Sequence, residues 1–176
     1  PAVSTEAPSA SDCVATLVFA DACRWSNDTG ALLEGQRLGK GELHLVQGLA
    51  LVRFDGGAVA VLSGNVLLDI ESRGSVRLHH GRLTVRAPDE AVGFTVRTRG
   101  SDVVDLGTEF AVEVDSKGSM ELHVLDGAVE YRRPEGRPGS GQLLHSGQAI
   151  RIDSRATTPR AVTADAKSLV QLLREA

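Results

Sequence analysis

Asp105 and Glu109 are the residues whose types and spacing come nearest to a reactive site. Two carboxylates four positions apart can bind a cation or share general acid and base roles. The sequence places no histidine and no further acid beside them at a recognisable motif spacing. Between them, Gly107 can take the positive φ of a sharp reversal, and Asp105 and Thr108 suit side-chain bonds to nearby backbone amides. We therefore predict that the segment Asp105-Leu106-Gly107-Thr108-Glu109 is a structural turn.

The remaining side chains with reactive potential form no catalytic or metal-binding pattern. Along the predicted strands, His44, His79 and His123 alternate with residues expected to be buried, so these three side chains are predicted to face solvent. A zinc site is not predicted. No Gly-x-Ser-x-Gly element and no glycine-rich phosphate loop followed by a helix is present. We expect no enzymatic activity, no cofactor and no bound metal. The histidines are His44, His79, His80, His123 and His145.

Two cysteines, Cys13 and Cys23, lie in one local segment. In an oxidising compartment they can close a small loop through a disulfide. The alternative is a pair of buried thiols. The sequence has no Cys-x-x-Cys element and no histidine at metal-ligand spacing from either cysteine, so a metal site is not predicted.

Composition limits the classes of partner. The chain has 176 residues and a net charge of -4, and no basic stripe carries interleaved aromatic residues, so nucleic-acid binding is not predicted. No apolar run approaches the ~18 residues that a membrane span needs. Any membrane anchor is therefore expected outside this sequence. Aromatic residues make up 3% of the chain, so the core must consist of Val, Leu, Ile and Ala.

Composition shifts along the chain predict three parts. Residues 1–12 are small and polar and indicate a linker, and residues 13–154 carry the strand patterns of one all-β domain. Residues 155–176 form a tail in which Thr163 to Ala176 carries apolar residues at helical spacing, which predicts a short helix. The Gly- and Pro-rich stretch Arg132–Gly141 holds three arginines. It is either a solvated hairpin tip or a docking loop for an acidic partner.

Glycines recur with a fixed apolar pattern after them, and the first three lie 16 and 17 positions apart. Apolar residues follow at the second, fourth and sixth places, as strands with one buried face require. The last glycine departs from this phase, since Ile150 and Ile152 lie one place off. Each unit is predicted to hold two short strands and two turns, which stack as a β-solenoid, a β-roll or a sandwich. The repeat glycines are Gly48, Gly64, Gly81, Gly127 and Gly147.

Between Gly81 and Gly127 the repeat gives way to longer strands. These are predicted over Val92–Thr98, Val103–Leu106, Phe110–Val114 and Met120–Leu125. Two elements in and after this region, Gly107-Thr108-Glu109-Phe110 and Val124-Leu125-Asp126-Gly127-Ala128-Val129, resemble the FecR domain family. The resemblance covers roughly Leu38 to Asp153, and its signature turn is Asp105, Leu106, Gly107, Thr108, Glu109 and Phe110.

The resemblance implies an extracytoplasmic, non-enzymatic sensor domain of an anti-sigma-type membrane regulator that binds a protein partner in the cell envelope. In such families a cytoplasmic N-terminal region holds the sigma factor, and this chain lacks that region and the membrane span. Exposed strand edges would offer backbone groups for strand addition by the partner. The alternative is a cell-surface or cell-wall module that binds carbohydrate or spaces other domains, for which Trp25 and Tyr131 are the available stacking platforms.

Overall fold

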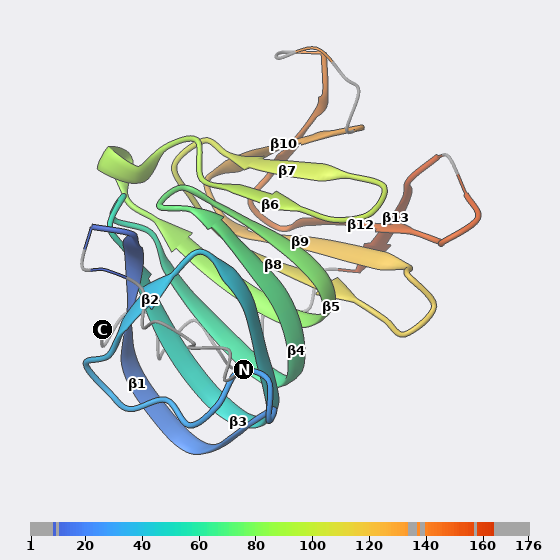
Figure 1. Ribbon diagram of the computed structural model, residues 1–176. Coiled ribbons are helices and arrows are strands. Elements are labelled where there is room, and N and C mark those ends of the chain that lie inside the picture. Colours follow the sequence, from blue (N-terminus) through green and yellow to red (C-terminus); the bar gives the residue numbers. More distant parts are fainter. Residues whose placement is uncertain (1–8, 10, 134–136, 138–139, 157, 164–176) are drawn as a thin grey trace.

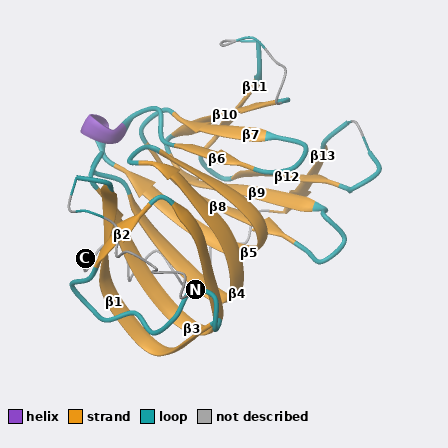
Figure 2. Ribbon diagram, viewed as in Figure 1, coloured by secondary structure: helices purple, strands orange, loops and turns teal. Residues whose placement is uncertain are grey.

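The computed structural model describes residues 9, 11–133, 137, 140–156 and 158–163. Over these residues the chain forms one hydrogen-bonded sheet of 13 strands and one 3-10 turn, η1, so the all-β prediction is confirmed (Figure 2). The predicted C-terminal helix lies outside the described residues, as does most of the predicted linker. No helix among the described residues is long and apolar enough to cross a membrane.

The elements follow one another without long gaps. Their bounds are β1 Cys13–Trp25, β2 Arg37–Gly39, β3 Gly41–Phe54, β4 Val59–Ser72, β5 Ser75–Ala87, η1 Asp89–Ala91, β6 Thr95–Arg97, β7 Asp102–Asp105, β8 Thr108–Val114, β9 Met120–Asp126, β10 Ala128–Arg132, β11 Gln142–His145, β12 Gln148–Ile152 and β13 Arg160–Thr163. The four longer strands predicted between Gly81 and Gly127 correspond to β6, β7, β8 and β9, although β6 is shorter than predicted. The sheet extends past residue 154, because β13 pairs with β12.

Three of the repeat glycines lie inside long strands. Gly48, Gly64 and Gly81 take φ values of 105°, 76° and 101° within β3, β4 and β5. The strand register shifts beside each of them, between Leu45 and Leu49 and between Ser63 and Leu67. The prediction of two short strands and two turns per unit was therefore wrong. A positive φ inserts a bulge that bends a strand without ending the pairing, so each unit is one bent strand.

The bend in β5 divides the sheet into two layers (Figure 1). Before Gly81, β5 pairs in parallel with β6, and β6 leads through β7 to β10 and β11; we call this side the first layer. After Gly81, β5 pairs with β8, which leads through β9 to β12 and β13; this is the second layer. The long strands β3 and β4 run through both layers.

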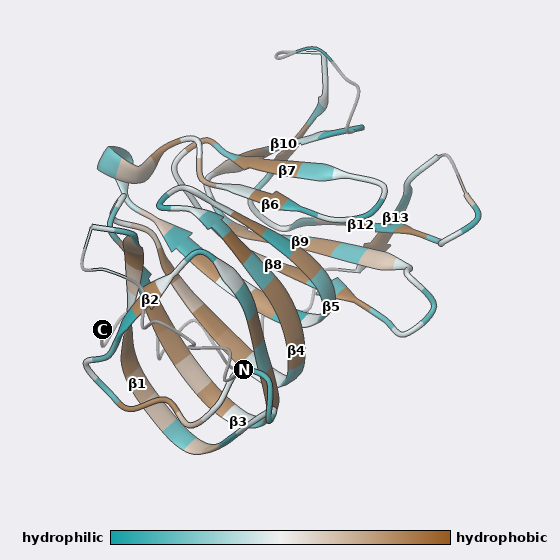
Figure 3. Ribbon diagram, in the orientation of Figure 1, coloured by the Kyte–Doolittle hydropathy of each residue, from teal (hydrophilic) through white to brown (hydrophobic). Residues whose placement is uncertain are grey.

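The core lies between the layers and contains the residues that the glycine pattern marks. Val66, Leu68 and Ile70 after Gly64 are buried, as are Leu83 and Val85 after Gly81. They belong to one cluster with apolar residues of both layers, so the sheet folds over on itself (Figure 3). Every strand pair except β5–β6 is antiparallel. The solenoid and roll alternatives are therefore not confirmed, and the fold is a single open sheet closest to the sandwich alternative.

The other repeat glycines lie where the chain crosses from one layer to the other. Gly107 joins β7 to β8, Gly127 joins β9 to β10, and Gly147 joins β11 to β12, with φ values of 96°, 82° and 84°. We call these three turns the crossing turns. Because every crossing occurs at the same end of the strands, the tips of the hairpins β6–β7 and β8–β9 and the last residues of β10 and β12 lie at the opposite end (right side of Figure 1). We call that opposite end the hairpin end.

Candidate functional site

The predicted signature turn is the first crossing turn. The Gly107 N–H donates to Asp105 Oδ2 over 3.1 Å, which closes a local side-chain turn at the end of β7. The Thr108 hydroxyl donates to the Ala128 carbonyl over 2.5 Å, and the Leu106 N–H donates to the same carbonyl over 3.1 Å. Thr108 was expected to bond a nearby amide, but its hydroxyl reaches a carbonyl of the next crossing turn. The signature turn thus fastens β7 and β8 to β10.

Asp105 is a fully buried carboxylic acid in this turn. Its side chain is 0% exposed, and Oδ1 has no hydrogen-bond partner among the described residues. Burial raises the pKa of Asp105, and the hydrogen bond from the Gly107 N–H opposes that rise only in part. Charging Asp105 therefore costs the folded state more than it costs the unfolded state.

This raised pKa predicts how stability depends on pH. An acid whose pKa is higher in the folded state favours folding most below its unfolded value of about 3.9, and this contribution is lost as pH rises through the folded value. Asp105→Asn keeps an acceptor for the Gly107 N–H and cannot ionise. Between about pH 4 and about pH 8, we expect the free energy of unfolding of the variant to rise by on the order of 1 kcal/mol relative to that of the unsubstituted chain. Urea unfolding at a series of pH values measures the difference.

Asp126→Asn is the matched control, because Asp126 is an exposed carboxylate in the adjacent crossing turn. Its stability difference from the unsubstituted chain should stay constant over the same pH range. Parallel curves for Asp105→Asn and the unsubstituted chain would show that Asp105 ionises normally and that its burial has no electrostatic cost.

Glu109 does not join Asp105 in a common site. It lies on β8, opposite Arg86 of β5 and Asp126 of β9, and is 7% exposed. A shallow hollow of about 250 Å³ contains Glu109, Arg86, Asp126 and Thr108 on its wall, whereas Asp105 is absent from that wall. The two carboxylates thus face different surroundings and do not share a wall of this hollow.

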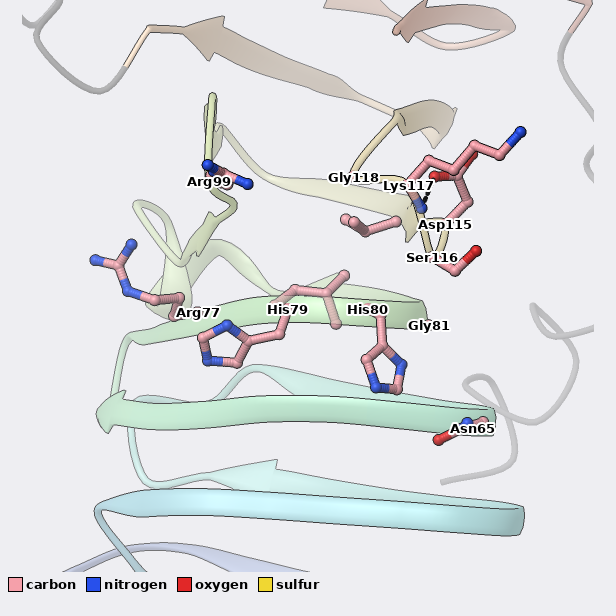
Figure 4. Close-up of a pocket in the computed structure, with 12 residues that line it drawn as sticks. Asn65, Arg77, His79, His80, Gly81, Arg99, Asp115, Ser116, Lys117 and Gly118 are labelled. Carbon is pink, nitrogen blue, oxygen red and sulfur yellow. Dashed lines mark hydrogen bonds between the residues drawn. The ribbon is translucent and has the colours of Figure 1, made fainter. Parts of the chain in front are cut away.

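A cleft of about 740 Å³ opens at the hairpin end, between the two layers (Figure 4). Its floor is the bent part of β5, with His79, His80 and Gly81. Arg99 of the β6–β7 tip forms one rim, and the turn from Asp115 to Gly118 between β8 and β9 forms the other. The divergence of the layers after Gly81 therefore creates the cleft, which has the size of a ligand-binding pocket.

Three ionisable side chains in this cleft are already paired. Arg77 binds Glu71 over 3.0 Å, and His79 contacts Asp69 over 2.7 Å. Although desolvation opposes it, hydrogen bonds from the Ser119 and Lys117 amides and from Arg151 hold the pKa of Asp115 below its usual value.

Two cations in the cleft have no ion-pair partner within the described part of the chain. These are the side chains of Arg99 and Lys117. The same two residues also line a second hollow of about 800 Å³, which Arg133, Asp153 and Arg155 border on the other side. The hairpin end therefore presents two adjoining hollows that share a cationic wall. Spacing along the sequence could not reveal this wall, since its residues come from different hairpins.

The histidines lie in three different settings. His44 and His80 pack edge to face, with ring centroids 5.8 Å apart, and His44 also bonds Asn65. His79 and His145 are exposed. His123, predicted to face solvent, is only 7% exposed. The described residues contain no group of three or more His, Cys, Asp or Glu side chains placed to hold a metal ion.

The cysteines are both free and partly exposed. Cys13 and Cys23 lie near opposite ends of β1, and a strand advances about 3.3 Å per residue. They are therefore too far apart for a disulfide, whose Cα atoms lie about 4.4–6.8 Å apart. The disulfide alternative was wrong because the segment forms one long strand and not a local hairpin. The Cys23 thiol donates to the Leu49 carbonyl over 3.1 Å, and burial raises its pKa.

Two further surfaces bear on binding. Within the described part of the chain, strand β11 pairs with β10 alone and leaves its other edge unpaired, and Leu143 on this strand is 53% exposed. This is the kind of edge that strand addition requires. Of the aromatic residues that a carbohydrate module would use, Tyr131 is 7% exposed and belongs to the core, while Trp25 is partly exposed.

Residues 47–130 match the model of the FecR protein family. Two crystal structures, both described as "a putative anti-sigma factor from Parabacteroides distasonis ATCC 8503", share the fold. The structure at 2.50 Å resolution has a TM-score of 0.62 and 23% identity, and the aligned part covers 76% of this chain and 64% of the solved chain. The structure at 1.65 Å resolution has a TM-score of 0.53 and 23% identity, and the aligned part covers 75% of this chain and 60% of the solved chain.

This chain thus spans less than two thirds of those solved chains. A search of curated protein sequences gives no match. The family match includes the signature turn, the second crossing turn and the bends of β3, β4 and β5. The resemblance predicted from the sequence is confirmed, since residues 47–130 match the FecR family model.

Proposed function

We propose that this chain is the extracytoplasmic, partner-binding domain of an anti-sigma-type membrane regulator. The FecR match and the shared fold with the Parabacteroides distasonis proteins support this class. In this proposal the domain senses its signal by contact with a protein of the cell envelope and catalyses no reaction. A regulator of this class would join the domain to a membrane anchor and a sigma-binding region.

The cationic wall of the hairpin end is the observation that carries the binding role. Loops at one end of a two-layer β domain are a common place for recognition, since the rigid sheet holds them and their sequences are free to vary. Among the residues that the structure describes, Arg99 and Lys117 have no acidic partner, and hollows open on both sides of them. Partner carboxylates would supply the missing counter-charges, so we infer that the partner presents an acidic segment.

The free edge of β11 provides a second contact for the same partner. Strand β11 follows the β10–β11 tip and so begins at the hairpin end. A polypeptide held by the cationic wall can therefore extend along this edge and pair with its backbone. In such an arrangement, charge selects the partner. Main-chain hydrogen bonds along the edge and apolar contact with the exposed Leu143 side chain then add affinity.

The double variant Arg99→Glu/Lys117→Glu tests the proposal. Reversing both charges puts carboxylates opposite an acidic partner, and we expect roughly a tenfold or greater loss of binding, with a smaller difference at high salt. The full chain is immobilised and exposed to cell-envelope extract of the organism that encodes it. Bound protein is cross-linked and identified by mass spectrometry, and its affinity is then measured with the purified partner.

The control variant is Arg24→Glu/Lys40→Glu, which changes the net charge by the same amount at exposed positions on β1 and beside β3. It should bind as the unsubstituted chain does. Equal binding by both double variants would refute the role of the hairpin end. A saturable signal on a glycan array, without any protein partner, would instead favour the carbohydrate module.

A further inference from the structure

The second hollow at the hairpin end receives cationic side chains from four separate segments of the chain. The tips of β6–β7 and β8–β9 contribute one each, and the residues that follow β10 and β12 contribute the other two. All four residues are exposed, so their side chains lie at the mouth of the hollow and can meet a ligand there. They are Arg99, Lys117, Arg133 and Arg155.

The negative charge of this hollow is already balanced. Asp153 is the single acidic residue among the described residues that line it. Its carboxylate accepts a hydrogen bond from the Arg151 Nε–H over 2.7 Å. Arg99, Lys117 and Arg155, by contrast, have no ion-pair partner within the described ranges. The hollow therefore has an excess of positive charge, which an anion of several charges would balance.

The floor of the hollow is made of buried side chains, two of which carry hydroxyl groups. Ser101 is 2% exposed and Tyr131 is 7% exposed. The Ser101 hydroxyl donates to the Tyr131 hydroxyl oxygen over 3.4 Å, while the hydrogen of Tyr131 itself has no acceptor among the described residues. Buried hydroxyl groups usually have their hydrogen-bonding capacity used. An oxygen atom of a bound ligand would accept the Tyr131 hydrogen.

The size and lining of the hollow suit a small molecule with phosphate groups. Its volume of about 800 Å³ falls within the roughly 300–1,000 Å³ of small-molecule sites. A carboxylate presents two oxygens in one plane, whereas a terminal phosphate group presents three that point in different directions. Cations from four segments can reach such oxygens from different sides, and arginine pairs with them through two parallel N–H groups.

We propose that the second hollow binds a small anion with two or more phosphate groups. The four cations hold the phosphate oxygens at the mouth, and Tyr131 donates its hydrogen to the ligand at the floor. The site does not depend on the proposed function, because it needs no protein partner. If the hairpin end also binds an acidic partner, the anion competes with that partner, since Arg99 and Lys117 line both hollows.

Titration calorimetry of the full chain with inorganic pyrophosphate tests the site. We expect saturable binding that Arg155→Gln weakens roughly tenfold, because a charge-assisted hydrogen bond is lost. Tyr131→Phe keeps the buried ring but loses the donor, and should weaken binding roughly fivefold. Arg24→Gln removes an exposed charge from β1 and should leave the affinity unchanged. Thermal unfolding should show that all three variants remain folded. Absence of saturable binding, or equal affinity for Arg155→Gln and the unsubstituted chain, would overturn the proposal.

Two comparisons establish the chemical class and the source of the ligand. Tricarballylate carries three carboxylates and a negative charge similar to that of pyrophosphate, and we expect it to bind roughly tenfold more weakly. Equal affinity would refute the assignment to phosphate. Vesicles that contain phosphatidic acid present the same chemistry on a lipid. Co-sedimentation that Arg155→Gln abolishes would assign the phosphate groups to lipid head groups, and lack of co-sedimentation would assign them to a soluble ligand.

Competition with the purified partner separates this inference from the proposed function. Arg155 lines the second hollow and not the cleft, so Arg155→Gln should bind the partner as the unsubstituted chain does. Releasing the partner from this variant should then require roughly tenfold more pyrophosphate. Binding of pyrophosphate without any protein partner would support the site and contradict the proposed function. Binding of a partner without binding of pyrophosphate would refute the site alone.

Discussion

Replacing Phe110 by alanine is expected to lower the free energy of unfolding by about 4 kcal/mol. Phe110 closes the signature segment, is 0% exposed and belongs to the main core. It lies opposite Val85 of β5 and Val124 of β9, so the truncation opens a cavity where three strands of the second layer pack. For a chain of this size the midpoint of thermal unfolding should fall by roughly 10 °C. Circular dichroism in urea and on heating measures both quantities.

Phe19→Ala is the control for this change. Phe19 lies on β1 and is 40% exposed, so the same atoms are removed from a side chain that packs far less. We expect a loss below about 1 kcal/mol. Similar losses for the two variants would mean that the signature phenylalanine is no more important to the core than a surface one.

Gly127→Ala is expected to cost about 3 kcal/mol, the second largest effect. Gly127 has a φ of 82°, which L side chains rarely adopt. A Cβ atom there would also overlap with the Gly107 carbonyl oxygen and come within 3.3 Å of the Thr108 Cα. The second crossing turn would have to move away from the signature turn and weaken the bonds to the Ala128 carbonyl.

Gly147→Ala separates the two contributions. Gly147 occupies the third crossing turn with a φ of 84°, nearly that of Gly127, but no atom lies within 4 Å of the position of its Cβ. This variant should lose only the conformational cost of about 1 kcal/mol. The difference between the two variants in urea unfolding measures the contact between crossing turns. If they lose equal stability, that contact contributes nothing.

Much of the fold could be predicted from residue types because its signals are local. Alternation of apolar and polar residues placed the strands, and Val66, Leu68, Leu83 and Val85 are buried as the glycine pattern requires. Gly107 takes the positive φ expected of a sharp reversal. These features depend on a residue and its near neighbours, which the sequence contains in full.

Whether each repeat glycine bends a strand or forms a turn could not be predicted in the same way. Gly64 and Gly127 are followed by the same apolar pattern, yet Gly64 bends a strand while Gly127 carries the chain between layers. A positive φ is compatible with a bulge or with a turn. Which of them occurs depends on whether the flanking residues pair with the same neighbours, and those neighbours are distant in the sequence.

Alternation also failed to predict the burial of His123. His123 has the expected outward orientation but is buried, because burial depends on what lies over the sheet as well as on which way a residue points. The cationic wall was hidden for a related reason. Arg99 and Lys117 belong to separate hairpins, and only the packing of the two layers brings their tips together.

The sequence by itself determined that this protein is an all-β chain with an aliphatic core, a glycine-centred signature turn and a FecR resemblance, since each of these is written in short runs of residues. Tertiary structure alone decided that the sheet folds into two layers, that the hairpin tips gather at one end and that Cys13 and Cys23 stay apart. The physical reason is that strand pairing joins residues far apart in the chain. The free energy that selects among pairings comes from burying two faces against each other, and no local pattern records it.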